Sequence, residues 1–187
     1  MNPRLLPVVQ AEDIWHAYRN TPVADLLSYH NLGWPLRTYQ RAELLIGMCM
    51  DHRKMLRLPD NFAYILRTGG ANLRRVEFKV SFAIALGGVR ALCLIGHTQC
   101  GMVRLTQRRE AFIRGLVVNA GWTAKKAVQH FDEHAAEFEI GDEVQFVCAE
   151  AQRLGQRYPK ILVAPLIYRV EDNRLYQLQE QESPGGS

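Results

Sequence analysis

The apolar stretch Leu44-Leu45-Ile46-Gly47-Met48, which ends at Cys49, decides the expected fold class. Apolar side chains on consecutive positions are typical of a β-strand that is buried on both faces. The same pattern returns at residues 91–95 and ends at Gly96-His97. A shorter strand at 63–66 and a helix over 73–86 are expected between the two. This order predicts an α/β fold with a mostly parallel central β-sheet flanked by helices.

The rest of the chain adds elements on both sides of these strands. Two short helices, or one broken helix, are expected over residues 11–30. After Gly101 we expect a helix, a loop around 119–121, and further helices near 123–137 and 142–157. A strand at 160–164 and a terminal hairpin of residues 166–170 and 174–178 follow. We divide the chain into an N-terminal helical arm (1–35), an α/β domain (36–179) and a polar tail (180–187). The arm has too few apolar residues for a domain of its own, so it packs on the rest of the chain or on a partner subunit.

The composition is that of an ordinary globular protein and narrows the function classes. Of the 187 residues 48% are hydrophobic and 22% are charged, with a net charge of +4. The basic residues form only short clusters, which argues against a nucleic-acid partner, while the net charge favours a small anionic substrate or product. No stretch is long enough for a membrane span or a signal peptide. We therefore expect a cytoplasmic protein with reduced cysteines and no membrane partner.

Metal-binding residue types follow two of the predicted strands. Cys49-Met50-Asp51-His52-Arg53 comes at the end of the first strand, and His97-Thr98-Gln99-Cys100 comes at the end of the third. The carboxyl ends of parallel strands meet at one edge of a sheet, where α/β proteins place their sites. Two thiolates and an imidazole form a three-ligand zinc set, and the fourth position falls to water or to Asp51. The domain 36–179 is therefore predicted to bind zinc.

These two motifs and the turn Arg67-Thr68-Gly69-Gly70 together resemble the β-class carbonic anhydrase family, over about residues 40–170. The resemblance implies zinc on Cys49, His97 and Cys100, and a catalytic carboxylate–arginine pair, Asp51 and Arg53. It also implies the activity of a zinc lyase, the reversible hydration of CO2 to bicarbonate by zinc-bound hydroxide. Members of the family are dimers or are built from dimers.

The predicted pair has a physical role in such a site. Because two thiolates cancel the charge of zinc, the protein must help to orient the attacking oxygen. Asp51 would accept a hydrogen bond from that oxygen, while Arg53 would lower the pKa of Asp51 and keep the carboxylate off the metal. By resemblance, Asp51 on zinc would give a closed, inactive state. The alternative interpretation of Asp51 and Arg53 is a salt bridge with a purely structural role.

Several alternatives remain open at the level of sequence. The same fold with zinc could hydrolyse carbonyl sulfide or carbon disulfide, or form a non-catalytic domain in which Asp51 is the fourth ligand. His52, Gln99 and the R-T-G-G turn depart from the usual family pattern. His52 is interpreted either as a packing residue or as a proton shuttle, and the role of Gln99 stays open. His130 and His134 are interpreted as a solvated helix face.

A homodimer is expected for a second reason besides the resemblance. The N-terminal segment carries Trp15, Tyr18, Leu26 and Leu27, which form an amphipathic surface without a core of its own.

Overall fold

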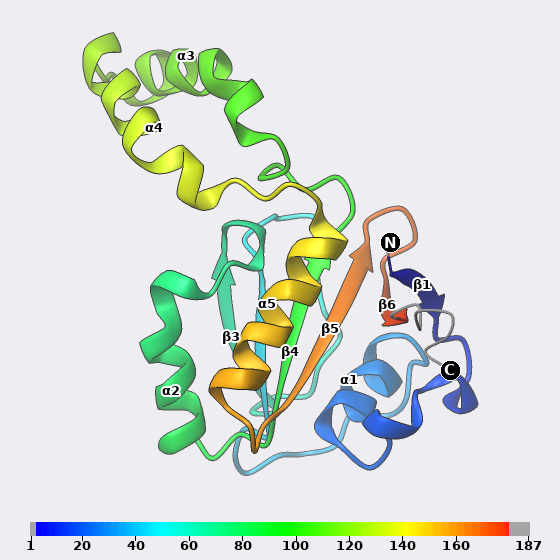
Figure 1. Cartoon of the computed structure of the whole chain (residues 1–187). Helices are drawn as coiled ribbons and strands as arrows, with labels where there is room; N and C mark the ends of the chain where they lie inside the picture. Colours follow the sequence, from blue (N-terminus) through cyan, green and yellow to red (C-terminus); the bar gives the residue numbers. More distant parts are fainter. Residues whose placement is uncertain (1–2, 180–187) are drawn as a thin grey trace, which may run out of the picture.

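A six-stranded mixed sheet forms the centre of the computed structural model, which describes residues 3–179 (Figure 1). The predicted tail 180–187 lies outside these residues. The strand order is β1-β6-β5-β4-β2-β3. The strands are β1 (Arg4–Pro7), β2 (Leu44–Cys49), β3 (Ala63–Thr68), β4 (Ala91–His97), β5 (Leu162–Arg169) and β6 (Arg174–Gln179). Strands β2 to β5 pair in parallel, and only β6 runs in the opposite direction, so that its pairs with β5 and β1 are antiparallel. The predicted fold class is confirmed.

The burial of the two central strands, β2 and β4, explains why their residues are apolar at consecutive positions. Every residue of β2 and of β4 is buried. Their side chains alternate between two cores: Ile46 and Met48 belong to the core under α1 (Pro22–His30), whereas Leu45 belongs to the core under α2 (Glu77–Ala85) and α5 (Glu143–Arg157). Helices on both faces therefore require apolar residues at every position of the strands between them.

A helical hairpin extends beyond the carboxyl ends of the central strands (Figure 1). It consists of α3 (Arg109–Ala120) and α4 (Ala124–Phe138). Gly121 ends α3 with φ +68°, and the side chain of Thr123 caps α4. The Phe112 and Phe131 rings lie 5.1 Å apart between the two helices. Five short 3-10 helices connect other elements of the described chain: residues 11–13, 16–18, 69–71, 74–76 and 105–108.

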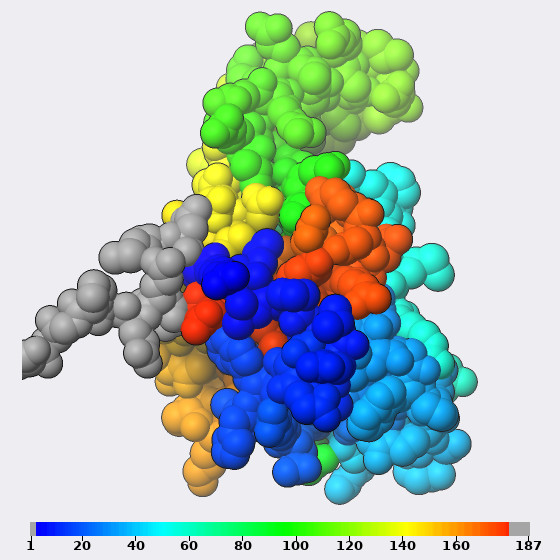
Figure 2. All heavy atoms as spheres, turned by 90° about the vertical axis from the view of Figure 1, so that its right-hand side faces the viewer, coloured from blue at the N-terminus to red at the C-terminus, as the bar shows by residue number. Residues whose placement is uncertain are grey.

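The N-terminal segment is part of the main core. Tyr18, Leu26 and Leu27 are buried in the cluster that also holds Ile46 of β2. Strand β1, which the sequence did not predict, pairs with β6. Figure 2 shows this segment spread over one side of the body, with the hairpin projecting past it. The segment thus packs on its own chain, which removes the amphipathic surface as a reason to expect a dimer.

Two other predicted elements are corrected. The predicted strand at 160–164 and the first arm of the predicted hairpin are one strand, β5, which continues through Pro165. Pairing with β6 begins only at Leu166, so the missing N–H of Pro165 leaves that ladder intact. The helix predicted over 73–86 is a 3-10 turn at Arg74–Val76 followed by the shorter α2.

Candidate metal centre

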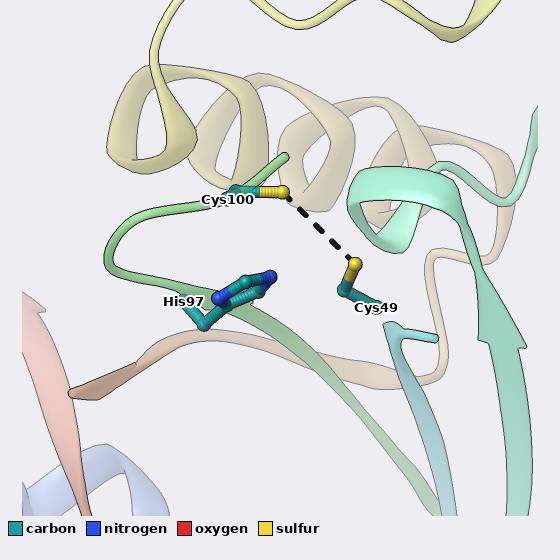
Figure 3. A group of neighbouring side chains, drawn as sticks. All are labelled: Cys49, His97 and Cys100. Atoms are coloured by element: carbon teal, nitrogen blue, oxygen red, sulfur yellow. Dashed lines mark hydrogen bonds between the residues drawn. The ribbon is translucent and has the colours of Figure 1, made fainter. Parts of the chain in front are cut away.

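Three side chains meet where β2 and β4 end (Figure 3). Cys49 is the last residue of β2, His97 is the last of β4, and Cys100 lies in the turn that follows. All three are buried, and their ligand atoms lie within 4.8 Å of one another. Within residues 3–179, no other set of three histidine, cysteine or acidic residues gathers in this way. The structure thus brings together the three residues that the sequence predicted as ligands.

The geometry fits a tetrahedral ion. The two sulfur atoms are 4.0 Å apart, close to the edge of about 3.8 Å that two Zn–S bonds of about 2.3 Å would span. The Nδ1–H of His97 donates to the backbone oxygen of Thr98 at 2.8 Å, so the lone pair lies on Nε2. Nε2 is buried and has no hydrogen-bond partner among the described residues. A buried nitrogen of this kind is explained by a metal that it would bind.

The local backbone places these ligands. Gly70 has φ +63°, which favours glycine, and its N–H donates to the sulfur of Cys49 at 3.4 Å. A Cβ at Gly70 would lie 3.2 Å from the side chain of Ile140. Gln99 also adopts a left-handed conformation, with φ 59°, between His97 and Cys100. The turn at Gly70 thus supplies a hydrogen-bond donor to the sulfur of Cys49, and the turn at Gln99 joins His97 to Cys100.

The sulfur atoms of Cys49 and Cys100 are within hydrogen-bond distance of each other, at 4.0 Å. A hydrogen bond from the Cys100 thiol holds the pKa of Cys49 well below its usual range and raises that of Cys100. Cys49 is therefore the more readily ionised of the two cysteines. A metal ion that binds here displaces the thiol protons, as is usual for cysteine ligands.

Asp51 lies beside this cluster and is held by Arg53. Arg53 donates from Nε to Oδ1 at 3.0 Å and from Nη2 to Oδ2 at 2.8 Å, and its backbone N–H adds a bond of 2.9 Å. These bonds from Arg53 hold the pKa of Asp51 far below its ordinary value. Oδ2 is 4.0 Å from Nε2 of His97. The carboxylate is therefore close to the metal position, while its oxygens are occupied by the guanidinium.

Solved structures of similar fold include several carbonic anhydrases. The carbonic anhydrase from Glaciozyma antarctica matches with a TM-score of 0.60 and 23% identity, over 88% of this chain and 99% of that one. The β-carbonic anhydrase isoform I from Trichomonas vaginalis matches with a TM-score of 0.61 and 12% identity, over 79% and 90%. The chain has the fold of the β-class carbonic anhydrases. The predicted resemblance is confirmed at the level of the fold.

The carbonic anhydrase fold is shared by a further kind of enzyme. A carbon disulfide hydrolase matches with a TM-score of 0.52 and 18% identity, over 87% of this chain and 92% of that one. No family model matches the sequence, and no curated protein is detectably similar to it. Since all of these identities are low, the comparisons establish the architecture and leave the reaction to the site itself.

On this carbonic anhydrase fold, Gln99 and Glu171 take part in a polar network that the sequence did not predict. Arg53 donates from Nη1 to Oε1 of Gln99 and from Nη2 to its backbone oxygen, both at 3.1 Å. Gln99 in turn donates to Glu171 at 3.0 Å. The departure of Gln99 from the family pattern could have indicated that this residue has a special role. Nothing in the sequence indicated Glu171, because it lies 72 residues further along the chain.

The remaining histidines lie outside the ligand cluster. His52 is exposed. The solvated face predicted for His130 and His134 is wrong, because both are half-buried and the His130 ring packs against Trp122 at 5.2 Å. They line a largely apolar cavity of about 510 Å³ between the hairpin and the edge of the metal centre. Its other lining residues include Met50, Gly69, Met102, Phe112, Phe131 and Phe138.

Proposed function

We propose that this chain binds zinc through Cys49, His97 and Cys100 and catalyses the reversible hydration of CO2 to bicarbonate. The observation that carries the proposal is the position of Asp51, 4.0 Å from the free nitrogen of His97 and bound on both oxygens by Arg53. A structural zinc site with Asp51 as the fourth ligand requires this carboxylate on the metal. The hydrogen bonds from Arg53 to both carboxylate oxygens support water as the fourth ligand instead.

Each residue beside the cluster has a task in this reaction. Zinc bound by the three ligands would act as a Lewis acid that makes water nucleophilic at neutral pH. Asp51 accepts a hydrogen bond from the attacking water and so aims an oxygen lone pair at the carbon of CO2. Its depressed pKa makes Asp51 an orienting acceptor rather than a proton acceptor, because a carboxylate so readily ionised is a weak base. Arg53 keeps it ionised and off the metal.

The surroundings suit a small substrate without charge. Met50, Gly69 and Met102 neighbour the ligand-bearing segments and also line the apolar cavity. CO2 is linear and apolar, so such a wall admits it at little cost in desolvation. The hydrolysis of carbonyl sulfide or carbon disulfide is a second candidate. It is favoured by the same apolar wall and by the fold shared with a carbon disulfide hydrolase.

The test is a stopped-flow assay of CO2 hydration with zinc-loaded and metal-free chain, run beside a carbonyl sulfide assay. We expect catalysis only by the loaded protein. A chain with one zinc that hydrates CO2 no faster than buffer at alkaline pH contradicts the proposal. If that chain consumes carbonyl sulfide, the second candidate takes its place. Asp51 bound to zinc at alkaline pH, in a structure of the loaded protein, would favour the non-catalytic alternative.

We also propose a homodimer, now on a different surface. Large apolar side chains are exposed on the edge strand β3 and on and just after α2: Tyr64, Ile65, Phe78, Phe82 and Leu86. Several large apolar side chains exposed on one strand and one helix are typical of an interface. Light scattering should give twice the mass of the chain, and Phe78→Glu should shift it to the monomer. A wild-type monomer at micromolar concentration would refute the dimer.

No helix among residues 3–179 combines the length and the apolar character that a membrane crossing requires. The cytoplasmic location stays a prediction.

A further inference from the structure

Lys54 is a buried cation that the proposed reaction does not use. Its side chain is 1% exposed, although it lies in the loop directly after the Asp51–Arg53 pair. Its Nζ has no hydrogen-bond partner among residues 3–179. A buried ammonium without an acceptor loses its hydration and gains nothing in return, so it calls for an explanation.

Lys54 belongs electrostatically to the metal centre. Burial lowers its pKa, while the negative charges of Cys49, Asp51 and Cys100 raise it. In turn, the charge of Lys54 lowers the pKa of Asp51 and of Cys100. The ammonium therefore lies within the field of the site, with no direct bond to any of these groups.

Other unpartnered groups gather in the same region. Four buried side-chain polar atoms lack a partner in the described part of the chain, and three of them belong to Lys54, Thr68 and His97. Thr68 ends β3 and pairs with Cys49 across the sheet. A metal explains Nε2 of His97. It leaves the ammonium of Lys54 and the hydroxyl of Thr68 as donors, and both require an acceptor that the described residues do not provide.

The charges of a zinc-loaded site point to the nature of that acceptor. The two thiolates balance the ion, and Asp51 balances Arg53. Lys54 remains in excess, and Arg67 adds to it, because the hydrogen bonds of Arg67 reach only the backbone oxygens of Cys49, Asp51 and Lys54. The loaded site therefore has an excess of positive charge.

We infer that Lys54 makes the zinc-loaded centre a binding site for one monovalent oxyanion, to which its ammonium donates a hydrogen bond. This inference rests on the proposed function for the presence of zinc, and it deepens that function by assigning a holder for the anionic product. A neutral substrate gains nothing from this charge, whereas bicarbonate does. Lys54 thus acts on the product side of the reaction, and Asp51 and Arg53 act on the attacking water.

The test measures anion binding and does not depend on catalysis. Full-length chain loaded with zinc is titrated calorimetrically with sodium nitrate, a planar monovalent oxyanion, and then with sodium bicarbonate. We expect saturable binding by the loaded wild type and none by the metal-free protein. Lys54→Met keeps the length and removes the charge, and should weaken nitrate binding on the order of tenfold to a hundredfold, the worth of one charged hydrogen bond. Zinc content should stay at one per chain.

Two variants serve as controls. Lys79→Met removes a lysine from the exposed side of α2 and should bind nitrate as the wild type does. Lys54→Arg keeps the charge and should retain most of the affinity. The inference is overturned if Lys54→Met binds nitrate as tightly as the wild type, or if Lys54→Arg loses as much affinity as Lys54→Met. Should Lys54→Met fail to fold, Lys54→Gln replaces it, and a loaded wild type that binds no nitrate overturns the inference without any variant.

The outcomes separate this inference from the proposed function. Nitrate binding that depends on Lys54, in a chain that does not hydrate CO2, leaves the anion site standing and removes the proposed reaction. If the chain hydrates CO2 but its nitrate binding does not depend on Lys54, the proposed reaction stands and the anion site at Lys54 is refuted.

Discussion

The ligand cluster and the polar network beside it differ in burial and in how fully their polar atoms are hydrogen-bonded. Cys49, His97 and Cys100 are buried, and the free nitrogen of His97 has no partner within the described chain. In the network, by contrast, Arg53 is bonded to both Asp51 and Gln99 and is partly exposed. The cluster is incomplete without an ion, whereas the network is complete as it stands.

This difference indicates how each part responds to change. A set of three buried ligands should lose most of its metal affinity when one is removed, because the other two cannot replace the missing ligand. A network of mutual hydrogen bonds near solvent loses one bond at a time, and water replaces much of each loss. Variants of the cluster should therefore affect metal content, and variants of the network should affect the rate.

The largest effect is expected from Cys100→Ser. A hydroxyl is a poor zinc ligand at neutral pH, so zinc affinity should fall by about a thousandfold, roughly a third of a binding free energy of about 10–16 kcal/mol. Elemental analysis after dialysis measures the zinc content. Cys148→Ser, on the half-buried side of α5, is the matched control and should keep its zinc. Full retention of zinc by Cys100→Ser would refute the ligand assignment.

Arg53→Ala should lower the CO2 hydration rate by about a hundredfold while zinc stays near one per chain. The released Asp51 can then bind the metal and displace the water. Asp51→Ala should also keep its zinc but retain slow hydration, because the water remains in place. If the pair is only a structural salt bridge, both variants lose stability and keep their rate. Zinc content, melting temperature and hydration rate of the two variants distinguish these cases.

Glu171→Ala tests the outer part of the network and should have a smaller effect. It removes the acceptor of Gln99 and of the Thr98 hydroxyl, so Gln99 holds Arg53 less firmly. The hydration rate should fall by about threefold to tenfold, because water replaces much of each lost hydrogen bond. Glu171→Gln keeps one acceptor oxygen and should lie between this variant and the wild type. An unchanged rate in Glu171→Ala would show that Arg53 is positioned without the network.

The smallest effect concerns stability in acid. The pKa of Asp51 in the folded chain lies below the ordinary 3.8, so its pairing with Arg53 stabilises the fold fully at neutral pH. That contribution declines as pH falls below about 4, towards the folded pKa. The melting temperatures of wild type and Arg53→Met should differ by a constant amount above about pH 5 and converge in stronger acid. A difference that grows with acidity would contradict this account.

Much of this protein was determined by local sequence. Runs of apolar residues at 44–48 and 91–95 specify strands buried on both faces, because only apolar side chains fit between two layers of helices. Since parallel strands end at one edge, residues placed just after them must meet. That is why the sequence could predict that Cys49, His97 and Cys100 lie together.

Contacts between distant segments were decided only by the tertiary structure. The bond of Gln99 to Glu171 depends on the turn between β5 and β6, and no local pattern encodes that turn's distance from β4. The burial of Lys54 likewise contradicts the usual preference of lysine for the surface. It arises from the path of the loop after β2, which Arg67 of β3 fixes through backbone oxygens. Periodicity encodes which face of an element is apolar, whereas the packing of loops against one another depends on the whole sheet.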